Sequence, residues 1–163
     1  MAIDRSFTIA GHGTVVTGSV GQGGVQVGDE LVIEPLGRNV RVRGVQNHDR
    51  AAESVARGQR AAINLAGVRH DELGRGHELA SPGFLRPSKL LSARIHLTPS
   101  APRPLKNRTR VRVHVGTAEL MATVVLLDRD LLEQGEQTVA QLFLSAPAVS
   151  TWDQPLVLRS ESR

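Results

Sequence analysis

The stretch Ser6–Ile33, SFTIAGHGTVVTGSVGQGGVQVGDELVI, decides the fold of this chain. It consists of short runs of β-branched residues separated by glycines, and no part of it has the period of a helix. Phe7 and Ile9 alternate with polar or small neighbours, as in a half-buried strand. Gly18 interrupts a regular strand pattern, which is typical of a bulge, a bend or a close approach of two backbones. The stretch therefore predicts a small β-barrel.

The rest of the chain continues in the same way. Period-2 alternation and turn residues predict further strands over 31–35, 39–46, 60–66, 77–80, 91–97, 110–115, 120–127, 139–144 and 155–159. The segment 47–57 is compatible with one short turn of helix. Fourteen of the 16 glycines lie at or before Gly83, where a Pro/Gly/Ser-rich segment begins the change in composition. We predict an all-β chain of two tandem antiparallel β-barrels, with a first barrel over 1–82, a linker over 83–87 and a second barrel over 88–163.

Composition excludes several classes of protein. With 40% hydrophobic but only 2% aromatic residues, any core must be built from aliphatic side chains. No apolar run is long enough to cross a bilayer, and Met1–Arg5 does not resemble a signal peptide, so we expect no membrane association. The chain has no cysteine, which excludes disulfides and fits a cytoplasmic protein.

Five blocks of sequence resemble one known family. Gly13–Gly18 (GTVVTG) followed by Val27–Glu30 (VGDE) is similar to the second domain of translational GTPases of the elongation factor Tu type. Three further blocks agree with this resemblance: 3–7 (IDRSF), 40–46 (VRVRGVQ) and 58–67 (GQRAAINLAG). The pair Asp4-Arg5 together with Gln59-Arg60 is most similar to the selenocysteine-specific elongation factors. The resemblance extends over nearly the whole chain and is stronger over residues 3–80.

The resemblance implies a part of a GTP-dependent translation factor that has no catalytic activity of its own. No Gly-x-x-x-x-Gly-Lys-Ser/Thr motif is present to hold phosphates, so a GTPase domain is expected before Met1, and a winged-helix part after Arg163. GTP and magnesium are expected for that missing GTPase domain, and no cofactor for these residues. The implied partners are selenocysteinyl-tRNA, the ribosome and the factor's own GTPase domain.

The family also implies a pocket for the amino acid that the tRNA carries, at Asp4, Arg5 and Arg60. A selenol is far more acidic than a serine hydroxyl and is an anion at neutral pH. Two guanidinium groups form charge-assisted hydrogen bonds to an anion, and Asp4 would orient one of them. Such a site rejects a neutral hydroxyl because its charges stay unpaired. The alternative interpretation is an ordinary surface ion pair beside a solvated arginine.

A second candidate site is a run of basic residues. No carboxylate lies between Glu78 and Glu119, and this window predicts a surface for the phosphate backbone of a tRNA duplex. Its candidate residues are Arg94, Arg103, Lys106, Arg108, Arg110 and Arg112. The alternative is a solvated β-sheet face. Two other functions stay open at this point: barrels of another translational GTPase, such as an initiation factor gamma subunit or a general GTP-binding protein, and a non-enzymatic basic scaffold.

Histidines give no further site. The six histidines lack the spacing of a zinc site, and no serine–histidine–aspartate arrangement can be argued from them. His12, in the glycine-rich turn, either approaches RNA or is simply exposed. We therefore predict neither a metal site nor an active site.

Overall fold

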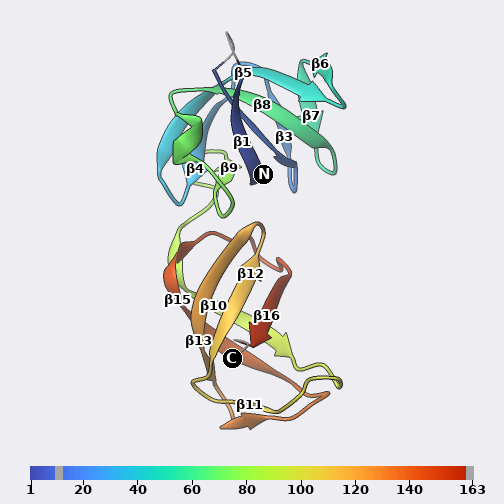
Figure 1. Cartoon of the computed structure of the whole chain (residues 1–163), viewed down its shortest axis with the longest axis vertical. Coiled ribbons are helices and arrows are strands. Elements are labelled where there is room, and N and C mark those ends of the chain that lie inside the picture. Colours follow the sequence, from blue (N-terminus) through green and yellow to red (C-terminus); the bar gives the residue numbers. More distant parts are fainter. Residues whose placement is uncertain (10–12, 161–163) are drawn as a thin grey trace. The chain divides into compact units, whose positions relative to one another are not determined.

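Residues 1–9 and 13–160 are described by a computed structural model, and their regular structure is almost entirely β-strand (Figure 1). The chain divides into two compact units. The first consists of Met1–Pro87 with the short segments Gly116–Ala118 and Val149–Gln154, and the second of the other residues from Ser88 onward. The prediction of an all-β chain is confirmed.

Unit 1 is a closed barrel. Its elements are β1 (Ala2–Ile9), β2 (Gly13–Ser19), β3 (Gly24–Gln26), β4 (Glu30–Glu34), β5 (Arg38–Asn47), β6 (Arg50–Ala52), β7 (Ser54–Ala56), β8 (Arg60–Ala66), the 3-10 helix η1 (His70–Glu72) and β9 (Glu78–Ala80). The strands pair in the order β4-β9-β1-β2-β8-β5, and β5 pairs with β4 to close the ring. β6 continues from β5, and β3 and β7 form a separate two-stranded ribbon.

Alternation along each strand separates the core of unit 1 from its outer face. In β8, Ala61, Ile63 and Leu65 are buried, whereas the residues between them are half-buried on the other face. The core cluster contains only aliphatic residues, with Ile3, Val16, Ile33, Ile63 and Leu65 among the most buried. Branched aliphatic side chains thus fill this barrel, as the low aromatic content predicts.

Unit 2 is a half-barrel over the described residues. Its strands are β10 (Ser88–His96), β11 (Leu105–Lys106), β12 (Arg110–Val115), β13 (Ala118–Leu126), β14 (Leu131–Leu132), β15 (Gln137–Ala148) and β16 (Leu156–Ser160). Five of them form a sheet in the order β10-β15-β13-β12-β16, and β11 pairs with β14. Val113, Val124 and Leu142 are fully buried on its inner face.

The segment 47–57 corrects one prediction. Instead of a short helical turn it holds β6 and β7, because its residues join strand ladders. β6 folds back as a hairpin on β5, with Ala52 opposite Val45, and β7 pairs with the more distant β3, with Val55 opposite Val25. The only helix among the described residues is η1, which the sequence pattern did not predict. Gly11 and His12 lie outside the described residues.

An acidic turn in unit 2 is held by a bidentate ion pair. Arg129 donates two hydrogen bonds of 3.0 Å to the Asp128 carboxylate, and Thr138 donates a third of 2.6 Å. The Arg129 guanidinium and the Thr138 hydroxyl together lower the pKa of Asp128 to about 2. The carboxylate is therefore ionised in the folded chain at pH values where it would be protonated in the unfolded chain.

This pKa shift predicts a pH-dependent contribution to stability. The folded-state pKa of Asp128 lies below the ordinary value of 3.8, so its stabilisation is complete above that value and is lost as the pH falls toward about 2. The difference in melting temperature between wild type and Asp128→Asn should shrink over this window in thermal unfolding followed by circular dichroism. Asp130→Asn, at an exposed carboxylate of the same turn, is the matched control. A difference that stays constant from pH 5 to pH 2 would contradict the assignment.

The single tryptophan lies on a tight turn of unit 1. Thr151 N–H donates to Gln154 Oε1 at 2.9 Å, and Gln154 N–H donates to the Thr151 carbonyl at 3.3 Å. Trp152, between them, is 97% exposed. The turn thus holds an indole ring in solvent.

Candidate functional site

A β-bulge at Asp4 positions the candidate anion site. In the pairing of β1 with β2, Ile3 lies opposite Gly18 and Arg5 opposite Thr17, so Asp4 has no partner. Ile3 is fully buried, whereas Arg5 is exposed. In a regular strand Asp4 and Arg5 would point to opposite faces. The extra residue turns both toward the outer face, which is a common use of bulges at binding sites.

Gly18 makes this bulge sterically feasible. A Cβ built at Gly18 would lie 2.1 Å from the Ala2 carbonyl oxygen, so only glycine allows the start of β1 to approach β2 this closely. Of the three explanations that the sequence pattern allows for Gly18, the close backbone approach is confirmed.

Asp4 accepts two strong hydrogen bonds. Arg60 Nη1 lies 2.6 Å from Asp4 Oδ2, and the Thr17 hydroxyl donates to Asp4 Oδ1 at 2.5 Å. Arg60 begins β8 opposite Ser19, on the same outer face. Burial alone would raise the pKa of Asp4, but the hydrogen bonds from Arg60 and Thr17 outweigh it and lower this pKa. The same contact raises the pKa of Arg60, so both groups remain charged.

Arg5 lies on the adjacent row of the same face. It pairs with Thr17, which pairs with Ala62 on the other side, so Arg5 is next to the Asp4–Arg60 pair. Its charge contributes to lowering the pKa of Asp4. Within the part of the chain that the structure describes, Arg5 forms no ion pair. The three predicted residues therefore form one cluster of two guanidinium groups and one carboxylate, with a net charge of +1.

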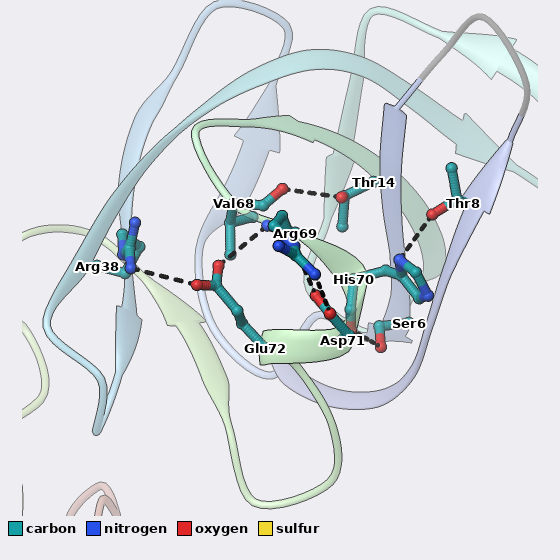
Figure 2. A network of polar contacts seen from close by, with 9 residues as sticks. All are labelled: Ser6, Thr8, Thr14, Arg38, Val68, Arg69, His70, Asp71 and Glu72. Atoms are coloured by element: carbon teal, nitrogen blue, oxygen red, sulfur yellow. Dashed lines mark hydrogen bonds and ion pairs between the residues drawn. The ribbon is translucent and has the colours of Figure 1, made fainter.

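A polar network farther along β1 holds η1 against this strand (Figure 2). The Ser6 hydroxyl contacts the carbonyls of His70 at 2.9 Å and Leu73 at 2.8 Å, and the Thr8 hydroxyl lies 2.8 Å from His70 Nδ1. Arg69 forms an ion pair with Asp71. These contacts hold the part of β1 that follows the bulge, at Ser6 and Thr8. The only feature of the sequence that could have indicated this network is the charged run Arg69–Glu72.

The predicted basic surface is rearranged in the structure. Arg94, Arg103, Lys106 and Arg110 line one open groove of about 1500 Å³ in unit 2, which Arg159 also lines. Among the described residues that line this groove there is no carboxylate. Arg112 instead forms an ion pair with Glu119, and Arg108 lies outside the groove in a turn with a φ of 61°. Four of the six predicted basic residues thus line a cationic groove, whereas Arg108 and Arg112 do not.

The described residues contain neither a metal-binding group nor a membrane-spanning helix. Within residues 1–9 and 13–160, no group of three or more metal-ligating side chains is close enough to hold a metal ion. A search of the same residues for a helix long and apolar enough to cross a membrane finds none.

Comparison with known proteins defines the class of this chain. Residues 13–80 match the family described as elongation factor Tu domain 2, and residues 92–163 match the β-barrel domain of the selenocysteine-specific elongation factor. The chain thus consists of β-barrel domains of an elongation factor Tu-like translation factor. Within that class it belongs to the selenocysteine-specific elongation factor family.

Individual relatives agree with this assignment. The chain is 42% identical over 162 residues to the selenocysteine-specific elongation factor of Desulfomicrobium baculatum, covering 99% of this chain and 26% of that protein. It is 31% identical to that of Haemophilus influenzae, covering 98% and 25%. A crystal structure of bacterial selenocysteine-specific elongation factor EF-Sec matches with a TM-score of 0.77 at 28% identity, covering 96% of this chain and 25% of that one. The chain therefore spans about a quarter of the length of these relatives.

Proposed function

We propose that Asp4, Arg5 and Arg60 bind the selenolate of selenocysteinyl-tRNA, so that these barrels hold the aminoacyl end of the tRNA for delivery to the ribosome. The observation that carries the proposal is the bulge that places Asp4 and Arg5 side by side on the outer face, with Arg60 bonded to Asp4. The proposal concerns binding alone, and no catalytic step is assigned to these residues.

The chemistry of the three side chains suits a small anion. A guanidinium group has five N–H donors, and the contact with Asp4 engages only one nitrogen of Arg60. The remaining donors of Arg60, together with Arg5, are available for charge-assisted hydrogen bonds to a selenolate. Asp4 meanwhile fixes the orientation of Arg60 and offsets part of the repulsion between the two cations in the empty site.

Discrimination against serine follows from the same arrangement. A seryl group presents a neutral hydroxyl, which offers a guanidinium only a weaker hydrogen bond. Because the preference depends on charge, it comes from the amino acid and not from the tRNA body. Seryl-tRNA with the same tRNA sequence is therefore the best comparison ligand, because it differs only in the amino acid.

The cationic groove supports a second, nonspecific contribution. Arg94, Arg103, Lys106, Arg110 and Arg159 can neutralise backbone phosphates without reading sequence. Phosphate contacts of this kind weaken steeply as salt increases. We assign this groove to the tRNA backbone, and assign GTP and magnesium to a GTPase domain of the longer factor, which acts in the cytoplasm.

The test compares two ligands at two salt concentrations. The full-length factor in its GTP form should bind selenocysteinyl-tRNA more tightly than seryl-tRNA of the same tRNA body, by a ratio that changes little with salt. Both affinities should fall as salt increases because the backbone contacts are common to both ligands. Equal affinity for the two tRNAs would overturn the anion pocket and leave only the backbone surface.

A further inference from the structure

A threonine from a distant part of the sequence contacts the backbone just before the bulge at Asp4. The segment Gly116–Ala118 belongs to unit 1, although it joins β12 to β13 along the chain. Thr117 is half-buried there, and its hydroxyl donates a hydrogen bond of 2.8 Å to the carbonyl oxygen of Ile3. The same hydroxyl oxygen accepts a hydrogen bond of 3.0 Å from the Gly76 N–H. A hydroxyl has a single hydrogen, so the one donor of Thr117 is committed to Ile3.

The Ile3 carbonyl lies where the pairing of β1 with β9 ends. The Ile3 N–H donates to the His77 carbonyl at 2.9 Å, and in an antiparallel ladder the His77 N–H would donate back to the Ile3 carbonyl. That N–H instead donates to the carbonyl of Gly74 at 3.3 Å. Because a backbone carbonyl in a folded chain needs a hydrogen-bond partner, the Thr117 hydroxyl takes the place of the missing ladder bond.

Gly116 allows the segment to lie this close to the start of the chain. Its φ is 56°, a left-handed conformation that favours glycine. A Cβ at this position would lie 2.9 Å from Glu78 Oε1 and 3.7 Å from the Cβ atom of Ala2. Thr117 therefore reaches Ile3 because the residue before it has no side chain.

The hydrogen bond to Ile3 acts on the peptide group that leads into the bulge. The Ile3 carbonyl and the Asp4 N–H lie in one plane, so a bond that fixes this oxygen also fixes the rotation of the peptide group before Asp4. Asp4 itself has no partner in the register of β1 with β2, so the ladder does not hold it. The chain just before the bulge is thus held on two sides, by Gly18 at Ala2 and by Thr117 at Ile3.

We propose that Thr117 is a positioning residue for the anion pocket. By holding the Ile3 carbonyl, its hydroxyl sets the direction of Asp4. Asp4 in turn orients Arg60 through their hydrogen bond of 2.6 Å. Thr117 does not contact the ligand and acts only through this chain of contacts. The inference rests on the proposed function, and it adds a residue on which specificity depends from outside the strands that form the pocket.

Titration of the Asp4 carboxyl carbon by NMR tests the positioning in this chain. Thr117→Val removes the hydroxyl at nearly constant size, so the hydrogen bonds that lower the pKa of Asp4 should loosen and this pKa should rise toward its ordinary value. Thr117→Ser keeps the hydroxyl and should keep the wild-type pKa of Asp4.

Thr14→Val is the matched control for the valine variant. The Thr14 hydroxyl also donates to a backbone carbonyl of unit 1, that of Val68, at 2.8 Å. Both valine variants should lower the melting temperature by similar amounts, because each leaves one carbonyl unpaired. Only Thr117→Val should change the pKa of Asp4, which separates positioning from a general loss of stability.

Binding by the full-length GTP-bound factor tests the consequence for specificity. Thr117→Val should lower the preference for selenocysteinyl-tRNA over seryl-tRNA about 3- to 10-fold, whereas Thr117→Ser and Thr14→Val should retain it.

The inference is overturned if the pKa of Asp4 in Thr117→Val stays at the wild-type value, or if it rises equally in Thr14→Val. It is also overturned if wild type prefers selenocysteinyl-tRNA and Thr117→Val keeps the full preference. If wild type binds the two tRNAs equally while the pKa of Asp4 responds as expected, the anion pocket fails and the positioning of Asp4 by Thr117 stands.

Discussion

Replacing Gly18 by alanine is expected to destabilise unit 1 by about 3 kcal/mol. The new Cβ would lie 2.1 Å from the Ala2 carbonyl oxygen and 3.0 Å from Met1 Cγ. Because the nearer atom belongs to the backbone, relief requires the start of β1 to move away from β2, and the loss of ladder hydrogen bonds adds to the cost. Urea unfolding followed by far-ultraviolet circular dichroism measures the change.

Gly21 provides the control for this substitution. A Cβ at Gly21 would meet no atom within 4 Å, so Gly21→Ala should change the free energy of unfolding by less than about 0.5 kcal/mol. Equal stabilities of the two alanine variants would show that β1 does not approach Gly18 as described. The bulge at Asp4 starts one residue beyond this contact, so Gly18→Ala should also weaken ligand binding at Arg60.

Removing the Arg60 side chain is expected to abolish most of the preference for selenocysteinyl-tRNA. Because Arg60 would form a charge-assisted hydrogen bond to the selenolate, Arg60→Ala should weaken selenocysteinyl-tRNA binding about 10- to 100-fold. The variant also leaves the Asp4 carboxylate without its strongest partner, close to the incoming anion. Seryl-tRNA, which has no charge at this place, should lose less than about threefold. Equilibrium binding of both tRNAs to the GTP-bound factor gives the two ratios.

Arg57→Ala is the matched control for that prediction, because Arg57 is an exposed arginine in the turn just before β8. It should reduce binding of both tRNAs by the same small factor. If Arg60→Ala also weakened both tRNAs equally, Arg60 would be a backbone contact, and the anion pocket would lose its main residue. Arg60→Lys should recover only part of the preference, since a single ammonium cannot bond Asp4 and the anion in the same fork geometry.

The local pattern predicted which residues face outward but not how they are brought together. Alternation along the chain indicated the strands around Ile63 and Val113, because the side-chain period of a strand is a local property. The bulge at Asp4 depends on the register between β1 and β2, which pairs Arg5 with Thr17 and Ile3 with Gly18, 12 and 15 residues away. Gly18 was its only local signal. The same reason explains β7, because Val55 pairs with Val25, 30 residues earlier, whereas β6 forms a local hairpin with β5.

Charge could be predicted less well than strand position. The run without carboxylates ends at Glu119, and that residue folds back across the β12–β13 hairpin to pair with Arg112. Arg159, far from the run in sequence, joins the groove because β16 pairs with β12. A linear count of charges cannot anticipate either change, since both depend on which strands become neighbours.

The exposed turn at Trp152 has a consequence for spectroscopy. The chain has one tryptophan and no tyrosine, and the indole ring of Trp152 is already in water in the folded state. Its fluorescence maximum should therefore shift little on unfolding, and light absorption near 280 nm should be weak for a protein of this length. The same emission should respond to any molecule that covers the turn. Trp152 fluorescence should therefore report contact at this turn and change little when the chain unfolds.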